Sequence, residues 1–252
     1  MTLFSLTDFR LDGSTAVVTG GSRNIGRSIA LAYAAAGADL VLVARHAGPL
    51  AQVAGLAREA GAAVREVVAD VSTAEGVAAL AEATDELEVD ILVNNAHTIG
   101  GTPGRPLLET DDDVWYDVLT TNLMAPFRLA RHFGRRMMRR GGGSILNLVS
   151  GSGLQPTPGL GPYGASKAAL SMLTRSLAVE VAPTVRVNAL CPGLVSEDGQ
   201  PRNDAHRLLL EAVPMHRVAE PDEIAGAALY LVSPAASYTT GAVLVANGGR
   251  PW

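Results

Sequence analysis

Tyr163 and Lys167 stand four residues apart in the stretch Tyr-Gly-Ala-Ser-Lys. On a helix, this spacing places both side chains on one face. A phenol with an unperturbed pKa of about 10 is a poor acid or base at neutral pH, but a nearby cation favours the phenolate and lowers that pKa. The pair could therefore move a proton. Taken alone, such a pair is more often an ordinary half-solvated helix face, so other residues must support the catalytic interpretation.

A second candidate site is the glycine-rich stretch 19–26, between an apolar run and a helical pattern. Glycines let the backbone approach a pyrophosphate, and a helix N-terminus offers free N–H groups and the positive end of a dipole. The alternative is a plain tight turn. The order of strand, turn and helix favours a phosphate-binding loop, whose candidate cofactor contacts are Gly20, Ser22, Arg23, Asn24, Ile25 and Gly26.

The choice of cofactor is predicted from Arg45, which follows the apolar run 40–44. An acidic residue at this place selects NAD by binding the ribose 2′-hydroxyl, whereas an arginine accommodates the 2′-phosphate of NADP. Arg23 could approach the same phosphate from the glycine-rich stretch, since guanidinium–phosphate pairing can be bidentate. Each arginine alone could be a solvated surface charge, but together they predict NADP(H) as the cofactor.

The elements that position these residues are short apolar runs in alternation with longer helical patterns. We expect strands at Thr15–Thr19, Asp39–Ala44, Ala63–Ala69, Asp90–Asn94, Gly143–Val149, Val185–Leu190 and Ala242–Ala246. We expect helices at Ile25–Ala36, Leu50–Ala60, Ala74–Glu86, Asp111–Arg140, Tyr163–Ala182 and Asp222–Val232. This order predicts one α/β domain over residues 1–252: a Rossmann-type, doubly wound fold with a seven-stranded parallel sheet flanked by helices on both faces. Ligands of such sheets bind beyond the carboxyl ends of the strands.

The chain resembles the short-chain dehydrogenase/reductase family over essentially its whole length. The family fingerprint T-G-x-x-x-G-x-G is matched by Thr19, Gly20 and Gly26, with Asn24 in place of the middle glycine. Because asparagine tolerates left-handed backbone angles, we expect the turn to be kept.

The resemblance also implies a catalytic set of Asn122, Ser150, Tyr163 and Lys167. Ser150 precedes Tyr163 by 13 residues, which is the family's spacing, and Ser152 is a nearby alternative. In the family, the tyrosine exchanges the proton, the serine hydrogen-bonds the substrate oxygen, and the lysine lowers the tyrosine pKa and binds the nicotinamide ribose. Asn122, unusual in mid-helix, would open its helix and hold a water that leads to Lys167. We therefore predict an oxidoreductase that interconverts ketones and secondary alcohols without a metal ion.

Further cofactor contacts are implied just after the third, fourth and sixth strands: Asp70, Val71, Asn94, Ala96, Pro192, Gly193 and Val195. In the family, the aspartate contacts the adenine ring. His97 replaces the glycine of the family's N-N-A-G pattern, a departure close to cofactor and substrate. The last three residues lie in a stretch similar to P-G-x-x-x-T, which binds the nicotinamide carboxamide, and we match Ser196 with its threonine.

Two alternatives stay open. The arginines between Arg135 and Arg140 could dock a carrier-protein-bound substrate, which keeps β-ketoacyl carrier-protein reductase as a candidate, although a solvated helix end explains them more simply. Asn24 and His97 weakly permit a catalytically silent NADP(H)-binding regulator, which the intact catalytic set opposes. We interpret the polar stretch 197–215 as a substrate lid.

The amino-acid composition limits which binding partners the protein can have. Hydrophobic residues make up 48% of the 252 residues and aromatic residues only 4%, so the core must be built from aliphatic side chains. A net charge of -5 argues against nucleic-acid or anionic-membrane binding. The single Cys191 fits a reducing compartment, and we find no signal-peptide pattern. We expect a cytoplasmic enzyme with a small-molecule carbonyl or alcohol substrate. The family's habit implies a homotetramer, in which Trp252 would pack against a neighbouring subunit.

Overall fold

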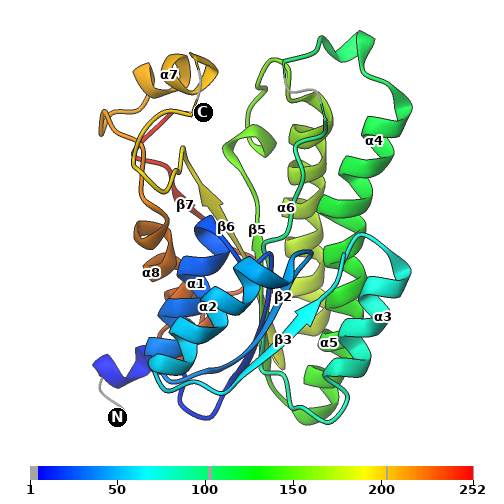
Figure 1. Cartoon of the computed structure of the whole chain (residues 1–252), viewed down its shortest axis with the longest axis vertical. Helices are drawn as coiled ribbons and strands as arrows, with labels where there is room; N and C mark the ends of the chain where they lie inside the picture. Colours follow the sequence, from blue (N-terminus) through cyan, green and yellow to red (C-terminus); the bar gives the residue numbers. More distant parts are fainter. Residues whose placement is uncertain (1–4, 102–103, 203, 252) are drawn as a thin grey trace.

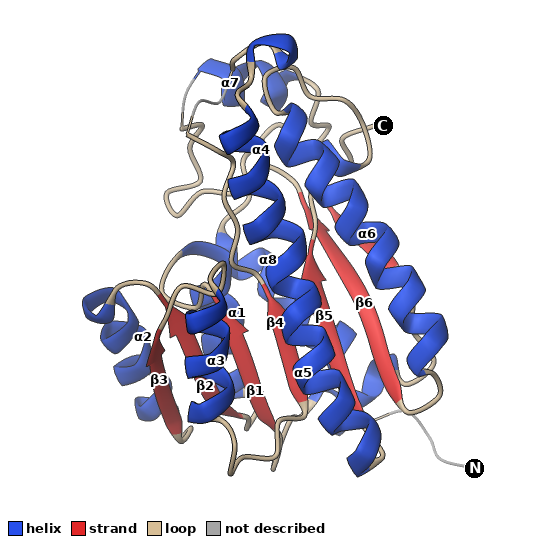
Figure 2. Ribbon diagram, turned by 90° about the vertical axis from the view of Figure 1, so that its right-hand side faces the viewer, coloured by secondary structure: helices blue, strands red, loops and turns tan. Residues whose placement is uncertain are grey.

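The computed structural model describes residues 5–101, 104–202 and 204–251, and its centre is a parallel sheet (Figures 1 and 2). Its strands are β1 (Thr15–Thr19), β2 (Asp39–Ala44), β3 (Val64–Val68), β4 (Ile91–Asn94), β5 (Gly143–Leu148), β6 (Val185–Pro192) and β7 (Val243–Ala246). They pair in the order β3-β2-β1-β4-β5-β6-β7, and every pair is parallel. The predicted seven-stranded, doubly wound sheet is thus confirmed, with its switch point between β1 and β4.

Helices cover both faces of this sheet. One layer consists of α1 (Asn24–Ala35), α2 (Ala47–Glu59) and α8 (Pro221–Val232). The opposite layer, in front of the sheet in Figure 2, consists of α3 (Ala74–Ala83), α4 (Asp112–Leu119), α5 (Ala125–Arg140) and α6 (Gly161–Val181). A further helix, α7 (Asp204–Glu211), lies beyond the carboxyl ends of the strands (Figure 1).

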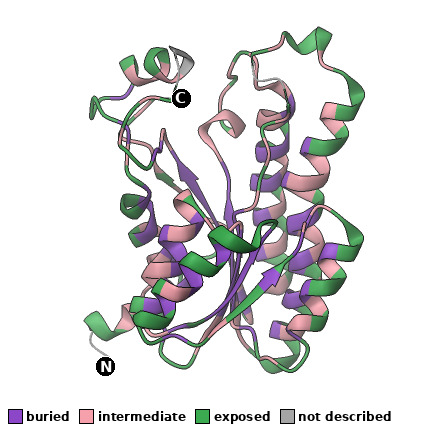
Figure 3. Ribbon diagram, in the orientation of Figure 1, coloured by how far each residue is buried: buried purple, intermediate pink, exposed green. Residues whose placement is uncertain are grey.

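The core is divided into two by the sheet itself. Because successive strand residues point to opposite faces, Ala16 and Val18 pack with α1 and α8, while Val17 packs with the layer of α5 and α6. Buried positions gather on the strands and on the helix faces turned toward them (Figure 3). Among the described residues, no helix is both long and apolar enough to cross a membrane.

Two helical predictions need correction. The expected helix over 111–140 is two helices, α4 and α5, joined by a π-helical turn over Thr120–Met124 that contains the buried Asn122. The stretch 197–215 contains α7, which we did not expect in a polar segment. The π-helical turn accompanies bonds of the Asn122 side chain to segments outside its own helix. α7 contains an amphipathic leucine run flanked by polar residues.

Candidate active site

Tyr163 and Lys167 project from the first turns of α6, at the carboxyl end of the sheet. The Lys167 Nζ lies 5.7 Å from the centroid of the Tyr163 ring. It donates a hydrogen bond of 2.7 Å to the carbonyl oxygen of Leu148, the last residue of β5. Lys167 is only 2% exposed, and burial lowers its pKa to about 7. The lysine can therefore exist as either amine or ammonium near neutral pH.

Burial also raises the pKa of the Tyr163 phenol, and the nearby Ser150 hydroxyl opposes this shift. The spacing of Tyr163 and Lys167 suggests that the lysine lowers the tyrosine pKa, but Lys167 is not among the causes of the Tyr163 pKa shift. The physical reason is that the buried lysine is itself shifted toward the uncharged amine. The electrostatic support that Tyr163 receives thus depends on the protonation of Lys167.

Ser150, rather than Ser152, is placed beside the phenol. It follows β5 and caps the 3-10 turn Gly151–Gly153, where its Oγ accepts a hydrogen bond of 3.2 Å from the Ser152 backbone N–H. The Ser152 side chain instead accepts a hydrogen bond from the Thr157 hydroxyl, at 3.0 Å. Ser150 follows β5 and Tyr163 lies in the first turn of α6, and the loop 151–160 connects these two elements. The fold thus places the two side chains next to each other.

Asn122 connects the π-helical turn to two other elements. Its Nδ2 donates hydrogen bonds to the Thr98 carbonyl oxygen at 2.8 Å and to the Ser166 Oγ at 3.0 Å, and its Oδ1 accepts one from the Thr98 N–H at 2.8 Å. The Ser166 hydroxyl donates in turn to the carbonyl oxygen of Tyr163, at 2.7 Å. Thr98 and Ser166 were missed from the sequence, although the position of Ser166 directly before Lys167 was a usable signal.

His97 faces the same site. Its ring centroid lies 6.3 Å from that of Tyr163, and its Nδ1 is 3.0 Å from the Asn95 carbonyl oxygen. His97 is exposed at its surface, but the surrounding protein still reduces the hydration of its imidazole ring. This desolvation, with the charge of Lys167, lowers the pKa of His97 to about 4. His97 is therefore neutral at pH 7.

The glycine-rich stretch forms the turn from β1 into α1. Asn24 has a φ of 48°, so the predicted left-handed conformation at the position of the missing glycine is confirmed. Its backbone N–H donates to Glu197 Oε1 at 2.9 Å, and its Oδ1 accepts a hydrogen bond from the Ile25 N–H at 2.8 Å. A Cβ on Gly26 would collide with the Gly20 carbonyl oxygen, so this packing requires glycine.

Asn95 holds this turn against β4 and was not among the predicted site residues. Its Nδ2 donates to the carbonyl oxygens of Thr19 and Gly20, at 2.9 and 3.1 Å. The Thr19 hydroxyl accepts hydrogen bonds from the N–H groups of Asn95 and Ala96, at 3.0 and 3.2 Å. Asn94, by contrast, is buried, with its Nδ2 bonded to Asn147 Oδ1 at 2.8 Å, so its side chain belongs to the core.

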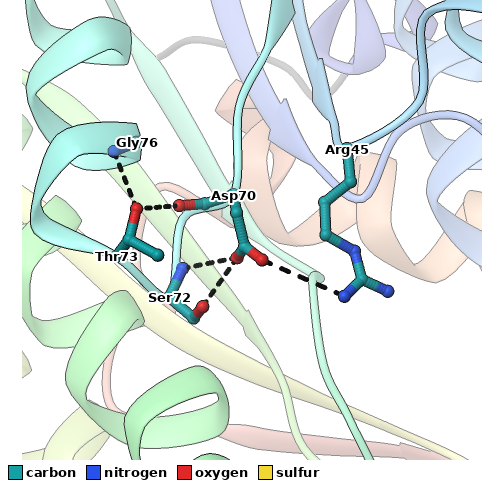
Figure 4. Close-up of polar contacts among 5 residues, drawn as sticks. All are labelled: Arg45, Asp70, Ser72, Thr73 and Gly76. Atoms are coloured by element: carbon teal, nitrogen blue, oxygen red, sulfur yellow. Dashed lines mark hydrogen bonds and ion pairs between the residues drawn. The ribbon is translucent and has the colours of Figure 1, made fainter.

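Figure 4 shows the predicted adenosine end of the site. The Ser72 N–H and hydroxyl both donate to Asp70 Oδ1. Burial raises the pKa of Asp70, but these two hydrogen bonds and the charge of Arg45 outweigh burial and hold the pKa below its usual value. Arg45 Nη1 lies 3.9 Å from Asp70 Oδ2. Arg23 lines a hollow together with Ser22. Two arginines can bind one phosphate without touching each other, so the convergence of Arg23 and Arg45 on a 2′-phosphate stays a prediction.

The segment after β6 is held by backbone contacts. The Gly193 N–H donates to the Ala246 carbonyl oxygen at 2.9 Å, and Val195 forms a bridge with Ala219. Our match of Ser196 with the threonine of P-G-x-x-x-T is wrong by one residue: the sixth position is Glu197. The Ser196 hydroxyl donates instead to the Gln200 carbonyl oxygen, at 2.7 Å.

The arginines at the end of α5 are partly engaged within the chain. Arg136 donates to the carbonyl oxygens of Thr84, Asp85 and Leu87. Arg140 bonds the Val89 carbonyl oxygen and Asp90 Oδ1, at 3.1 and 2.6 Å. These two side chains tie α5 to the segment before β4, and Asp90 offsets the charge of Arg140.

The geometry around the switch point fits a dinucleotide. The N-terminus of α1 suits a pyrophosphate. The adjoining hollow of about 420 Å³ is lined by Ser22 and Arg23, but also by the carboxylates of Glu197, Glu220 and Asp222. The phenol, hydroxyl and amine of Tyr163, Ser150 and Lys167 lie at the same edge of the sheet, as a proton exchange beside a nicotinamide requires.

The chain is similar to known proteins over nearly its whole length. Residues 20–250 match the family model described as enoyl-(acyl carrier protein) reductase. The chain is 46% identical to the galactitol 2-dehydrogenase (L-tagatose-forming) of Cereibacter sphaeroides, over 96% of this chain and 97% of the relative. It is 39% identical to the 3-oxoacyl-(acyl-carrier-protein) reductase of Vibrio harveyi, over 95% and 98%. A solved gluconate 5-dehydrogenase of Burkholderia cenocepacia, in complex with NADP and tartrate, superposes with a TM-score of 0.88 at 34% identity and 98% coverage of both chains.

Proposed function

The chain belongs to the short-chain dehydrogenase/reductase family, and on that premise we propose that it transfers hydride between NADP(H) and a ketone or secondary alcohol, with Tyr163 as general acid and base. The observation that carries this proposal is the placement of Tyr163, close to Ser150 and one helical turn before the buried Lys167. Three groups that a proton exchange needs thus lie together, next to a turn suited to phosphate binding.

In the proposed reduction, Ser150 hydrogen-bonds the carbonyl oxygen and Tyr163 gives it a proton. General acid catalysis of this kind contributes roughly 10²–10⁴-fold. Lys167, when protonated, stabilises the resulting phenolate and binds the nicotinamide ribose, while Asn122 supports a water relay that restores the proton. The nicotinamide, when bound, supplies the hydride to the carbonyl carbon.

The preference for NADP(H) rests on Arg45, which is exposed at the end of β2 and lies where a ribose 2′-phosphate would be met. The similarity to the gluconate 5-dehydrogenase solved with NADP supports this choice. We expect the further contacts along the glycine-rich stretch, at Asp70 and Val71, at Ala96 and the backbone of Asn94, and at Pro192, Gly193 and Val195.

For the substrate, we infer a polyhydroxylated alcohol or the corresponding ketone, because a galactitol dehydrogenase and a gluconate dehydrogenase are among the similar proteins. The Vibrio harveyi relative keeps a β-ketoacyl carrier-protein substrate as the second candidate. The bonds of Arg136 and Arg140 to their own chain weaken that candidate, since they occupy part of the basic surface that it requires.

The test is a substrate panel at neutral pH. Galactitol, D-gluconate and simple secondary alcohols are offered with NADP⁺ or NAD⁺, and ketoses, simple ketones and a β-ketoacyl thioester with NADPH or NADH, while nicotinamide absorbance is followed. We expect turnover of a polyol and its ketone, faster with the phosphorylated cofactor. Tight NADPH binding without any turnover would support the silent regulator, and failure to bind either dinucleotide would contradict the proposal.

A further inference from the structure

Glu197 joins the glycine-rich turn to the segment that follows β6. Its Oε1 accepts a hydrogen bond of 2.9 Å from the backbone N–H of Asn24, although the two residues are 173 positions apart. Asn24 is the first residue of α1. A carboxylate therefore lies on the N-terminus of the helix that we assign to the cofactor pyrophosphate.

The sequence of α1 leaves this N-terminus open to an external anion. The helix has no acidic residue in its first turn, and its N-cap residue Arg23 makes no side-chain capping hydrogen bond. The left-handed conformation of Asn24 allows its Oδ1 to bond the Ile25 N–H, so one N–H group is capped locally. Glu197 supplies the negative charge that the helix dipole favours at this end.

The chain just before Glu197 is anchored, while its side chain can move. Val195 bridges to Ala219, and the Ser196 N–H donates to the Ala219 carbonyl oxygen at 3.1 Å. Glu197 itself is exposed and lines the same hollow of about 420 Å³ as Ser22 and Arg23. Its carboxylate can therefore turn into solvent without a change in the anchored backbone.

We propose that Glu197 is an internal anion that competes with the dinucleotide pyrophosphate for the Asn24 N–H and thereby sets the affinity for the cofactor. This inference rests on the proposed function, because it requires a pyrophosphate at α1. A carboxylate and a phosphate oxygen cannot share one N–H group, and their like charges repel. Binding must therefore displace Glu197, which also releases the first residue of the stretch 197–215.

The test is NADPH binding to Glu197→Gln by isothermal titration calorimetry. Glutamine keeps the side-chain length and an acceptor oxygen but removes the charge. We expect the dissociation constant to fall about two- to fivefold, the range of an exposed charge at a helix terminus. Binding of adenosine 2′-monophosphate, which has no pyrophosphate, should be unchanged. The matched control is Asp222→Asn, because Asp222 is an exposed carboxylate lining the same hollow.

The results separate this proposal from the proposed function. A Glu197→Gln variant whose NADPH affinity rises less than about twofold overturns it, as does an equal gain for adenosine 2′-monophosphate or for Asp222→Asn. A wild-type protein that binds neither NADPH nor NADH contradicts the proposed function, and this proposal falls with it. Wild-type binding without a gain in Glu197→Gln overturns this proposal alone.

Discussion

Lys167 combines near-complete burial with a titratable amine and a carbonyl acceptor on β5. Its pKa is lowered from 10.5 to about 7 because burial disfavours the ammonium. Between these two values the unfolded chain binds a proton that the folded chain lacks, so the free energy of unfolding rises with pH across this window. Below about pH 7, the folded chain must hold a buried charge, and the full cost of that charge is present.

Lys167→Met removes this contribution. We expect the free energy of unfolding of the wild type to gain about 1 kcal/mol per pH unit relative to the variant between pH 7 and 10. Urea unfolding of both proteins at several pH values in this window measures the difference. Parallel pH dependences would show that the amine is not desolvated as the structure indicates.

Arg45 is the residue on which the cofactor preference depends. Its side chain is 65% exposed and its approach to Asp70 is long, so the ion pair adds little stability. Arg45→Asp places a carboxylate where the ribose 2′-hydroxyl would lie, and we expect the ratio of kcat/KM for NADPH over NADH to fall at least about tenfold. The exposed Arg175 on α6 serves as a control, and Arg175→Asp should keep the ratio. An unchanged kcat/KM ratio in Arg45→Asp would show that Arg45 does not determine the cofactor preference.

At the level of elements, the turn from β1 into α1 depends on glycine at one position. A Cβ on Gly26 would meet the Gly20 carbonyl oxygen and the Asn95 amide, whereas a Cβ on Gly55 in α2 would meet nothing within 4 Å. We expect Gly26→Ala to lower the free energy of unfolding by about 1–3 kcal/mol and to weaken NADPH binding. Gly55→Ala should be neutral or stabilising by up to about 1 kcal/mol. Urea unfolding and NADPH titration compare the two, and equal effects would contradict the argument.

The sequence located most elements but not every break within them. Strand positions followed from apolar runs, because a parallel sheet covered on both faces buries successive residues alike. The π-helical turn was foreseen only through the family resemblance of Asn122, since its bonds to Thr98 and Ser166 come from segments distant in the chain. α7 was missed because its polar flanks outweighed a short leucine run.

At the level of the whole molecule, the candidate site follows from the strand order. Because β1 lies beside β4, the glycine-rich turn contacts the loop that begins at Asn95. The alternation of strands and helices along the sequence is enough to predict this neighbourhood. The bond between Asn24 and Glu197, and the ties of Arg136 and Arg140 to carbonyl oxygens, could not be read from the sequence. Such contacts depend on where side chains of remote segments point, which periodicity does not specify.

Self-association is also a property of the whole molecule. Tyr116 on α4 and Met172 and Val179 on α6 are large and exposed in the single chain, with Val179 83% exposed, while Trp252 lies outside the described residues. Such uncovered apolar side chains favour an interface between copies. We expect light scattering after size-exclusion chromatography to give four times the chain mass of 26.1 kDa. Met172→Glu should lower that mass, and a monomeric wild type would contradict the expectation.

The proposed hydride transfer depends on the proton exchange at Tyr163. Tyr163→Phe keeps the ring beside Lys167 and His97 but removes the hydroxyl. With a substrate identified by the panel, we expect kcat to fall at least about 10²-fold, while the NADPH dissociation constant stays within about threefold of the wild type. Steady-state kinetics with calorimetric NADPH binding measures both quantities. A variant that retained near-normal kcat would contradict the central claim.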